Sequence, residues 1–389
     1  MIAPHRPSNS KITVRPVMTY REMGRFIDVP WRIYASDPMW VPPLRLERRF
    51  HFSRYNPFFK HGEWQAWVAY KDDQPAGRIS AQIDTLYQER YGKDRGHFGL
   101  LECIDDSDVF AALILHAEAW LASREVRHIN GPFNFSINQE CGLLVEGFDT
   151  PPVIMMPHTA RWYGRLLAAQ GYLPQKDLLA YKIKVDFQFP PLMQTIIKRF
   201  SSQITLRTLR RDRFDAEMET LRDIFNDAWS ENWGFVPFTQ EEFAELGSSL
   251  RLLLPDEYIQ IAEVNGEPAA FMVGLPNLNE VLAELNGNLF PLGWLKLINR
   301  IRNREISCTG GYADLALRSV DMLKAFLFPI QNNSSIEANF TPNGYDELME
   351  FLANPEKNGF TEENNSTVAV DADAESKPKK GKKDNILRI

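Results

Sequence analysis

Polar side chains that can move protons or hold a substrate gather between residues 134 and 163. They stand among apolar runs, and the prolines and glycines of the same stretch predict loops. Loops that carry such groups beside apolar strands are where binding residues tend to lie. The polar residues that we single out in this stretch are Asn134, Ser136, Asn138, Glu140, Asp149, His158 and Tyr163.

Two of these residues can act as a base towards an amine. Glu140 carries a carboxylate and His158 an imidazole, so both are candidate catalytic residues. His158 is equally well placed to cap the helix expected after it. The asparagines can also be plain turn residues. The residues expected to contact a substrate are Asn134, Asn138, Asp149 and Tyr163.

A strand–turn–strand pattern that could position these groups occurs twice in the chain. Residues 64–84 (WQAWVAYKDDQPAGRISAQID) read as a hairpin, and residues 259–278 (IQIAEVNGEPAAFMVGLPNL) repeat it. Pro75-Ala76-Gly77 aligns with Pro268-Ala269-Ala270 at an offset of 193 residues. A repeat of this length indicates two related structural units.

Local signals place helices and strands around the two hairpins. Apolar residues at helical spacing predict a helix over residues 20–34, which Pro30 should kink or end. The acidic run 105–108 predicts a turn and N-cap before an amphipathic helix over 109–124. We divide the chain into a leader (1–10), a first unit (11–185), a linker (186–203), a second unit (204–370, divergent after 308) and a disordered tail (371–389).

Composition limits the classes of function. The chain has 389 residues, of which 44% are hydrophobic and 24% charged, values typical of a globular protein with two or three domains. The net charge of -7 gives no reason to expect a nucleic-acid partner. Neither a signal peptide nor a transmembrane segment is expected, and we predict a cytoplasmic protein.

Cysteine usage agrees with that expectation. Cys103, Cys141 and Cys308 are far apart in sequence and odd in number. This pattern argues against a disulfide framework and against a zinc site, so we expect reduced thiols and no metal.

Residues 44–62 combine basic and aromatic side chains. Such interleaving can bind nucleic acid or phosphates. The alternative is an amphipathic segment folded over a core with its charges in water, and the acidic character of the whole chain favours this alternative.

The expected order of elements resembles that of the GCN5-related N-acetyltransferase (GNAT) fold. This order is a strand, two helices, three antiparallel strands, a helix, a strand, a helix and a strand. The resemblance covers most of residues 11–370, where the fold would occur twice. Residues 131–181 carry a more specific likeness in SIN-x-E-x-GLLVEGFD-x-PP, MPH and KDL-x-AY. They resemble a bacterial family of acetyltransferase-like proteins of about this length. The resemblance implies an α/β (α+β) fold of two tandem mixed sheets flanked by helices.

The resemblance also implies acetyl-CoA as co-substrate, with its pyrophosphate on backbone N–H groups of a glycine-bearing loop at a helix N-terminus. The first unit has three aspartates there and no glycine, and carboxylates repel pyrophosphate. It is therefore not expected to hold CoA in the usual way. In the second unit Gly311-x-Ala313 matches the end of the family's loop, whereas Cys308 stands where Gln or Arg is usual. The CoA-binding residues expected from the resemblance are Thr309, Gly310, Gly311, Tyr312 and Ala313, although a plain turn fits the same pattern.

A tyrosine donates a proton to the leaving thiolate in many members of the resembled fold. Tyr345 lies before Gly359-Phe360 as Tyr163 lies before Gly171-Tyr172, so Tyr345 is the candidate acid. The alternative is a packed tyrosine with its hydroxyl hydrogen-bonded.

Two functional hypotheses follow. The first is an acyl-CoA-dependent N-acyltransferase that transfers an acyl group, in the first instance acetyl, to an amine on a small molecule or peptide. The second is a non-catalytic binding or regulatory protein that has lost CoA affinity, because both phosphate loops depart from the family pattern.

Overall fold

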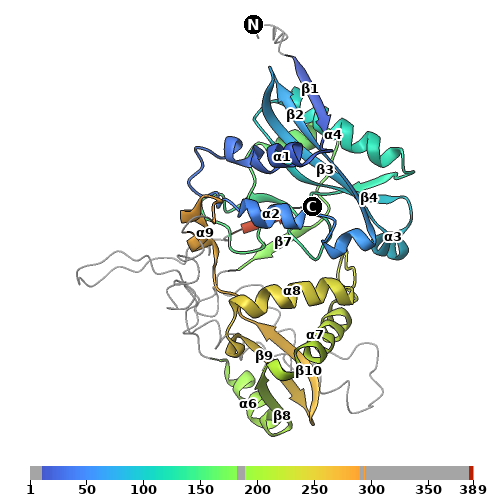
Figure 1. The fold of residues 1–389 in the computed structure, drawn as a ribbon. Coiled ribbons are helices and arrows are strands. Elements are labelled where there is room, and N and C mark those ends of the chain that lie inside the picture. Colours follow the sequence, from blue (N-terminus) through green and yellow to red (C-terminus); the bar gives the residue numbers. More distant parts are fainter. Residues whose placement is uncertain (1–10, 182–188, 290–292, 294–384, 389) are drawn as a thin grey trace, which may run out of the picture.

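A computed structural model describes residues 11–181, 189–289, 293 and 385–388 (Figure 1). The described residues form two units of mixed α/β structure that meet along α8, in the loop before it and around α9. The first unit contains β1 (Ile12–Pro16), α1 (Tyr20–Ile33), α2 (Arg45–His51), β2 (Gly62–Lys71), β3 (Gln74–Asp84), α3 (Thr85–Tyr91), β4 (Arg95–Cys103), α4 (Ser107–Ala122), β5 (His128–Asn130), β6 (Leu143–Glu146), α5 (Tyr163–Ala169) and β7 (Asp177–Ala180). The second contains α6 (Pro191–Phe200), β8 (Ile204–Thr208), α7 (Phe214–Trp229), α8 (Gln240–Leu253), β9 (Ile259–Val264), β10 (Glu267–Val273) and α9 (Asn279–Leu285).

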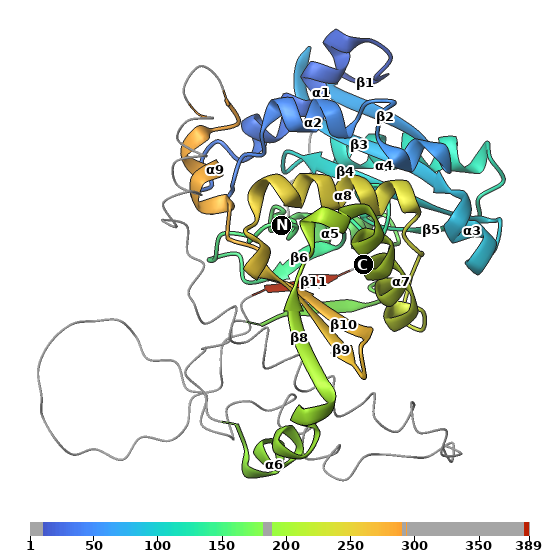
Figure 2. The ribbon, with the colours of Figure 1, turned by 60° about the horizontal axis from the view of Figure 1, so that its bottom comes forward.

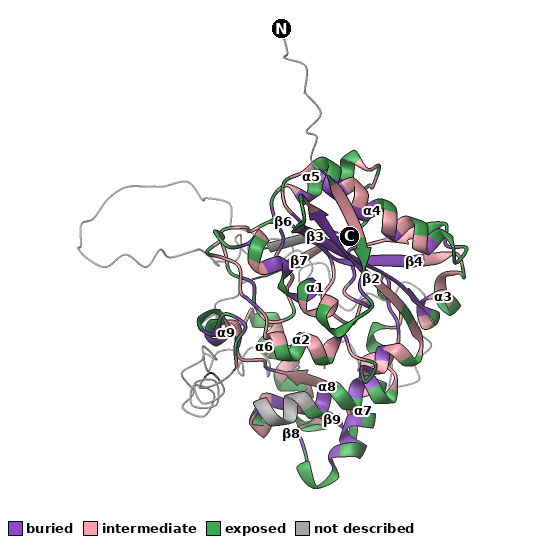
Figure 3. Ribbon diagram, turned by 45° about the horizontal axis from the view of Figure 1, so that its top comes forward, coloured by how far each residue is buried: buried purple, intermediate pink, exposed green. Residues whose placement is uncertain are grey.

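The first sheet has the order β1-β2-β3-β4-β5, antiparallel except for the parallel pair β4–β5. Successive side chains of a strand point to opposite faces. Accordingly Trp67 and Ala69 of β2 join the apolar cluster under α4, whereas Val68 and Tyr70 join the cluster under α1. The sheet is therefore covered on both faces, and its central strands are buried (Figure 3).

Pro30 neither ends α1 nor leaves a buried carbonyl unpaired. The expectation was a kink or an end at Pro30; the helix continues to Ile33, so it does not end there. A proline lacks the N–H that would bond to the carbonyl four residues before it. That carbonyl, on Phe26, instead accepts a hydrogen bond of 3.1 Å from Nη1 of Arg78 in β3. The sheet thus supplies the donor that the helix lacks.

The second unit repeats the beginning of the first, as the internal repeat predicts. Its sheet has the order β10-β9-β8, which matches β3-β2-β1, and all pairs are antiparallel. Both hairpins turn through two residues of positive φ, Asp72-Asp73 in the first copy and Asn265-Gly266 in the second. A register shift follows at the same place in each hairpin, beside Pro75 and Pro268. The second unit is described as far as α9.

The C-terminal segment returns to the first unit. Residues 385–388 form β11 (Asn385–Arg388), which pairs antiparallel with β6 on one side and β7 on the other (Figure 2). The strand order is β6-β11-β7, so β11 joins two strands that do not pair with each other. These four residues differ from the disordered tail expected from the sequence.

The strand β5 is short: it ends at Asn130, where Gly131-Pro132 follows. The helix after Asp106 is confirmed, with Asp106 as its N-cap. In the part of the chain that the structure describes, no helix is long and apolar enough to cross a membrane.

Candidate active site

A buried group of polar side chains lies at the carboxyl end of β4. One oxygen of Glu102 accepts hydrogen bonds from the hydroxyls of Tyr34 (2.5 Å) and Tyr163 (2.9 Å). Nη2 of Arg78 lies 3.6 Å from the other oxygen. The Tyr163 hydroxyl also accepts the backbone N–H of Cys103, at 2.7 Å. Two neighbouring strands and the ends of two helices therefore converge on one carboxylate.

Burial dominates the electrostatics of this group. It raises the pKa of Glu102 above the usual value, although Arg78 and the two tyrosine hydroxyls act in the opposite direction. Burial also raises the pKa of Tyr34 and of Tyr163 well above the usual range, so both hydroxyls stay protonated. Groups with pKa values displaced in this way are often found where proton transfer takes place.

An imidazole and a second carboxylate extend the group towards the surface. Nε2 of His158 lies 2.8 Å from Oδ2 of Asp37, and its ring packs edge-on against Tyr34 at 5.5 Å between centroids. The other ring nitrogen, Nδ1, is buried without a hydrogen-bond partner among the described residues. Burial raises the pKa of Asp37, but hydrogen bonds from His158 and from the Met39 N–H outweigh it and hold that pKa below the usual value. Asp37 stays charged and orients His158.

Asn134 and Glu140 form a neighbouring pair next to an irregular point of β4. Leu100 has a φ of +46°, and its N–H donates to Oδ1 of Asn134 at 2.9 Å. Nδ2 of Asn134 then donates to Glu140 at 3.1 Å. The carboxylates of Glu47 and Glu140 hold the pKa of Arg48 above its ordinary value, although burial acts to lower it. Glu140 is thus tied to the loop and to α2, and Leu100, the partner of Asn134, lies two residues before Glu102 in β4.

The structure therefore separates the residues that the sequence singled out. His158 and Tyr163 meet around Glu102, while Asn134 and Glu140 form the second pair. Asn138 donates to the Val236 carbonyl of the second unit, at 2.9 Å, and so belongs to the seam between the units. Asp149 is exposed in the loop after β6. His158 does not cap α5, whose N-cap residue is Trp162.

The N-terminus of α4 is occupied by the chain's own carboxylate. Asp106 accepts the backbone N–H groups of Asp108 (3.0 Å) and Val109 (3.1 Å), and it is ion-paired with Lys71. Asp105 pairs with Arg165 at 2.7 Å. These contacts favour the expectation that the first unit does not bind pyrophosphate at this helix.

The other predicted positions lie outside the described residues: Thr309, Gly310, Gly311, Tyr312, Ala313 and Tyr345. Cys308 also lies there.

Burial raises the pKa of the Cys103 thiol and raises that of Cys141 to about 11, so both thiols stay protonated. Among the described residues no group of three or more histidine, cysteine, aspartate and glutamate side chains could hold a metal ion.

Two bacterial proteins are similar to this chain over about three quarters of its length. It is 51% identical to "Protein YghO" of Escherichia coli over 290 residues, 74% of each chain. It is 44% identical to "Bacterial ceramide synthase" of Caulobacter vibrioides over 306 residues, 78% of this chain and 80% of that one. The chain therefore belongs to the family of these two bacterial proteins. No protein-family profile matches the sequence.

Solved structures similar to this chain include two GNAT proteins. A tandem GNAT protein from the clavulanic acid biosynthesis pathway aligns with a TM-score of 0.40 and 12% identity, over 67% of this chain and 73% of that one. A GCN5-related glucosamine N-acetyltransferase region of a fungal enzyme aligns with a TM-score of 0.41 and 12% identity, over 82% of this chain and 34% of that one. The expected α/β fold class is confirmed, because the described residues form a five-stranded mixed sheet and a second sheet, both flanked by helices.

Sequence reasoning missed Tyr34, Asp37, Arg78 and Glu102. Glu102 lies in an apolar strand, FGLLEC, and Arg78 is a single charge in the strand AGRISAQI. A charge inside a strand predicted to be buried must find a partner. Applied to the sequence alone, that rule pairs these two strands through their opposite charges.

Proposed function

We propose that this protein is an N-acyltransferase that forms the amide bond of a ceramide-type lipid. The acyl group would come from an acyl-CoA thioester, and the acceptor would be the primary amine of a long-chain amino alcohol. The observation that carries the proposal is the 44% identity over 80% of the Caulobacter protein named bacterial ceramide synthase. That name favours a fatty acyl group over the acetyl group expected from the sequence. A small-molecule amine acceptor and the cytoplasmic location remain part of the proposal.

The chemistry needs an amine that has lost its proton before it attacks the thioester carbonyl. In this proposal His158 accepts that proton at Nδ1, the buried nitrogen without a partner among the described residues. Asp37 is the positioning residue, because its contact with Nε2 orients the ring. Glu102, whose charge also acts on His158, stabilises the imidazolium that forms.

The donor side of the proposal rests on the second unit. Acyl-CoA would lie against residues 309–313, and Tyr345 would protonate the leaving thiolate. Asp106 supports this arrangement, because it already occupies the N–H groups at the start of α4 in the first unit.

Mass spectrometry of a reaction with palmitoyl-CoA and sphinganine tests the function. We expect an amide product and free CoA. His158→Asn should lower kcat by about 10²- to 10⁴-fold, the usual contribution of a general base. His128→Asn is the matched control, because His128 is exposed and pairs with Asp94 on the surface. Equal activity of both variants would remove His158 from the mechanism.

A non-catalytic role is the second candidate, favoured by the blocked N-terminus of α4. Thermal unfolding with added palmitoyl-CoA separates the two. A ligand at about 100 times its Kd adds about 2.7 kcal/mol to the free energy of unfolding, so a catalyst should show a clear rise in Tm. An unchanged Tm at saturating acyl-CoA would favour the binding or regulatory role.

A further inference from the structure

Exposed aromatic and apolar side chains gather where the start of α1 lies against the end of α2. Met18 is 74% exposed, Tyr20 77%, Phe50 66% and Tyr55 75%. Large apolar side chains in one exposed group mark a surface that contacts something else. With Arg49 and Arg54 these four residues make up what we call the aromatic–arginine surface.

Contacts within the chain hold this surface together. The guanidinium of Arg49 lies 4.2 Å from the ring centroid of Tyr20, which joins α2 to α1. Ser53 donates to the Phe50 carbonyl at 2.7 Å and accepts the Tyr55 N–H at 3.3 Å. The guanidinium of Arg54 lies 5.2 Å from the ring centroid of Tyr55. Each arginine thus stands beside an exposed aromatic ring.

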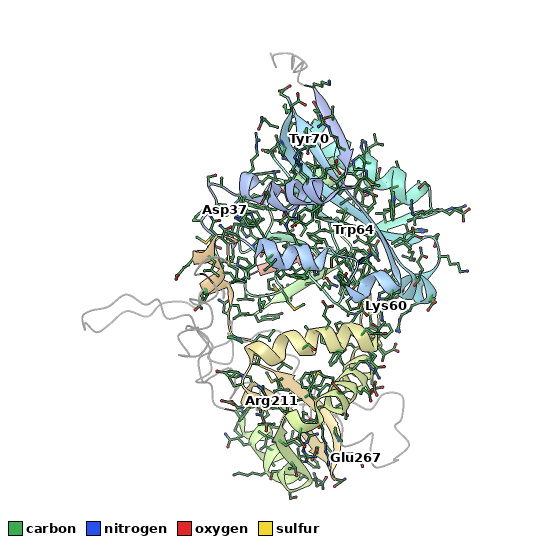
Figure 4. All side chains as sticks on the ribbon, in the orientation of Figure 1. Asp37, Lys60, Trp64, Tyr70, Arg211 and Glu267 are labelled. Carbon is green, nitrogen blue, oxygen red and sulfur yellow. The ribbon has the colours of Figure 1, made fainter. Side chains whose placement is uncertain are left out.

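The two arginines of the surface differ from the other basic residues of the same segment. Arg45, Arg48 and Lys60 are ion-paired with Asp28, Glu47 and Glu241 respectively. Figure 4 shows Lys60 at the side of the first unit that faces α8. Within the described residues Arg49 and Arg54 form no ion pair, so their charge is available to an external anion.

The local charge is opposite to that of the whole chain. Residues 18–62 contain eight arginine and lysine residues against four aspartate and glutamate residues, although the protein has a net charge of -7. A basic patch on an acidic protein attracts an anionic partner to one place.

We propose that the aromatic–arginine surface docks on an anionic phospholipid bilayer. Aromatic and apolar side chains enter the headgroup boundary, and neighbouring arginines bind lipid phosphates. Phe50 and Met18 favour lipid over nucleic acid, because fully apolar side chains gain little from a solvated polyanion but are stabilised at an acyl boundary.

The reason why this protein would dock on a bilayer rests on the proposed function. A lipid amine that is drawn from a bilayer has to reach the buried site. α1 connects the two places, because Tyr20 is its first residue and Tyr34, its C-cap, binds Glu102. The rise of an α-helix puts the two ends of α1 about 20 Å apart.

Co-sedimentation of the full chain with vesicles tests the docking. We expect binding to phosphatidylcholine vesicles that contain phosphatidylglycerol, little binding to phosphatidylcholine alone, and loss of binding at high salt. Phe50→Ser with Tyr55→Ser should weaken binding about tenfold, and Arg49→Glu with Arg54→Glu at least as much. Matched controls are Leu173→Ser with Tyr181→Ser, which are 85% and 58% exposed elsewhere in the first unit, and Arg213→Glu.

The outcomes separate this inference from the proposed function. In detergent micelles the Phe50→Ser/Tyr55→Ser protein should keep its amide-forming activity, because neither residue contacts the candidate site. On anionic vesicles the same protein should lose both its binding to the vesicles and its activity. Loss of vesicle binding in a protein without amide-forming activity would support the surface and count against the function. Vesicle binding equal to the wild type in both double variants would overturn the inference. So would binding of single-stranded RNA without binding of vesicles.

Discussion

The two repeated hairpins have the same backbone and different buried chemistry. At the offset of 193 residues that aligns them, Arg78 of β3 corresponds to Phe271 of β10, and Tyr70 of β2 to Glu263 of β9. In the first copy Arg78 reaches Glu102 and the Phe26 carbonyl. In the second copy Phe271 packs against an apolar cluster.

In the second copy the partly buried charged side chains lie on β8, β9 and α7 instead. Arg207 of β8 lies 2.6 Å from Glu217 of α7 and 2.5 Å from Glu263. Its counterpart in the first copy, Arg15, lies over the Tyr70 ring at 4.7 Å. One hairpin backbone therefore supports either a polar group near β4 or an ion cluster near β8. The repeat positions a site without determining its chemistry.

The largest effect should come from replacing Arg78 by phenylalanine, the residue type that the second copy has at the corresponding position, 271. Arg78→Phe leaves the buried Glu102 carboxylate without its cation and the Phe26 carbonyl without a donor. Loss of one partner of a buried pair costs about 3–5 kcal/mol in the free energy of unfolding, measurable by urea denaturation. Because the folded-state pKa of Glu102 would rise further, the variant should regain stability as the pH falls.

Phe271→Leu is the control in the second copy. It keeps an apolar side chain of similar size, and such exchanges cost less than about 1.5 kcal/mol. If the two variants lost equal stability, the polar group around Glu102 would not be what distinguishes the copies.

The sequence predicted the repeat, both hairpins, the helix capped by Asp106 and the position of the polar loop. Local signals suffice there, because turn residues and caps act over a few residues. Glu102 and Arg78 were missed because their partners come from elements far away in sequence. The strand β11 was missed because four residues carry little signal until β6 and β7 offer two unpaired edges. The continuation of α1 past Pro30 could not be predicted, because the donor to the Phe26 carbonyl comes from β3.

The seam between the copies should respond to pH. Nδ1 of His61 lies 3.0 Å from Asp84, and Nε2 lies 3.2 Å from Glu242 of α8. Burial lowers the pKa of His61, but the carboxylate of Asp84, which is hydrogen-bonded to Nδ1, and the nearby carboxylate of Glu242 outweigh it and raise the pKa to about 9. Lys60, Glu241 and Glu245 are the other charged groups near this contact.

A histidine whose folded-state pKa exceeds its unfolded value stabilises the fold fully below about pH 6.5, and this contribution disappears as the pH rises through about 9. We expect a loss of about 2 kcal/mol between those limits, after allowance for solvent screening. Urea denaturation from pH 6 to pH 10 measures it, and His61→Gln should flatten the profile. His97→Gln is the control, since burial lowers the pKa of His97 to about 4 and keeps it neutral throughout this range. A wild-type profile already flat over this range would mean that His61 is uncharged.

The smallest effect should come from exchanging the turns. Asp73 has a φ of +59° and Gly266, at the same place in the second hairpin, a φ of +88°. Positive φ is strained for aspartate and free for glycine, and two-residue hairpin turns favour glycine here. Asp73→Gly should therefore raise the free energy of unfolding by about 0.5 kcal/mol, and Gly266→Asp should lower it by a similar amount. The Arg15–Asp73 ion pair of 3.4 Å is exposed and offsets little of the gain. Changes of the same sign at both turns would show that the two hairpins do not share one turn geometry.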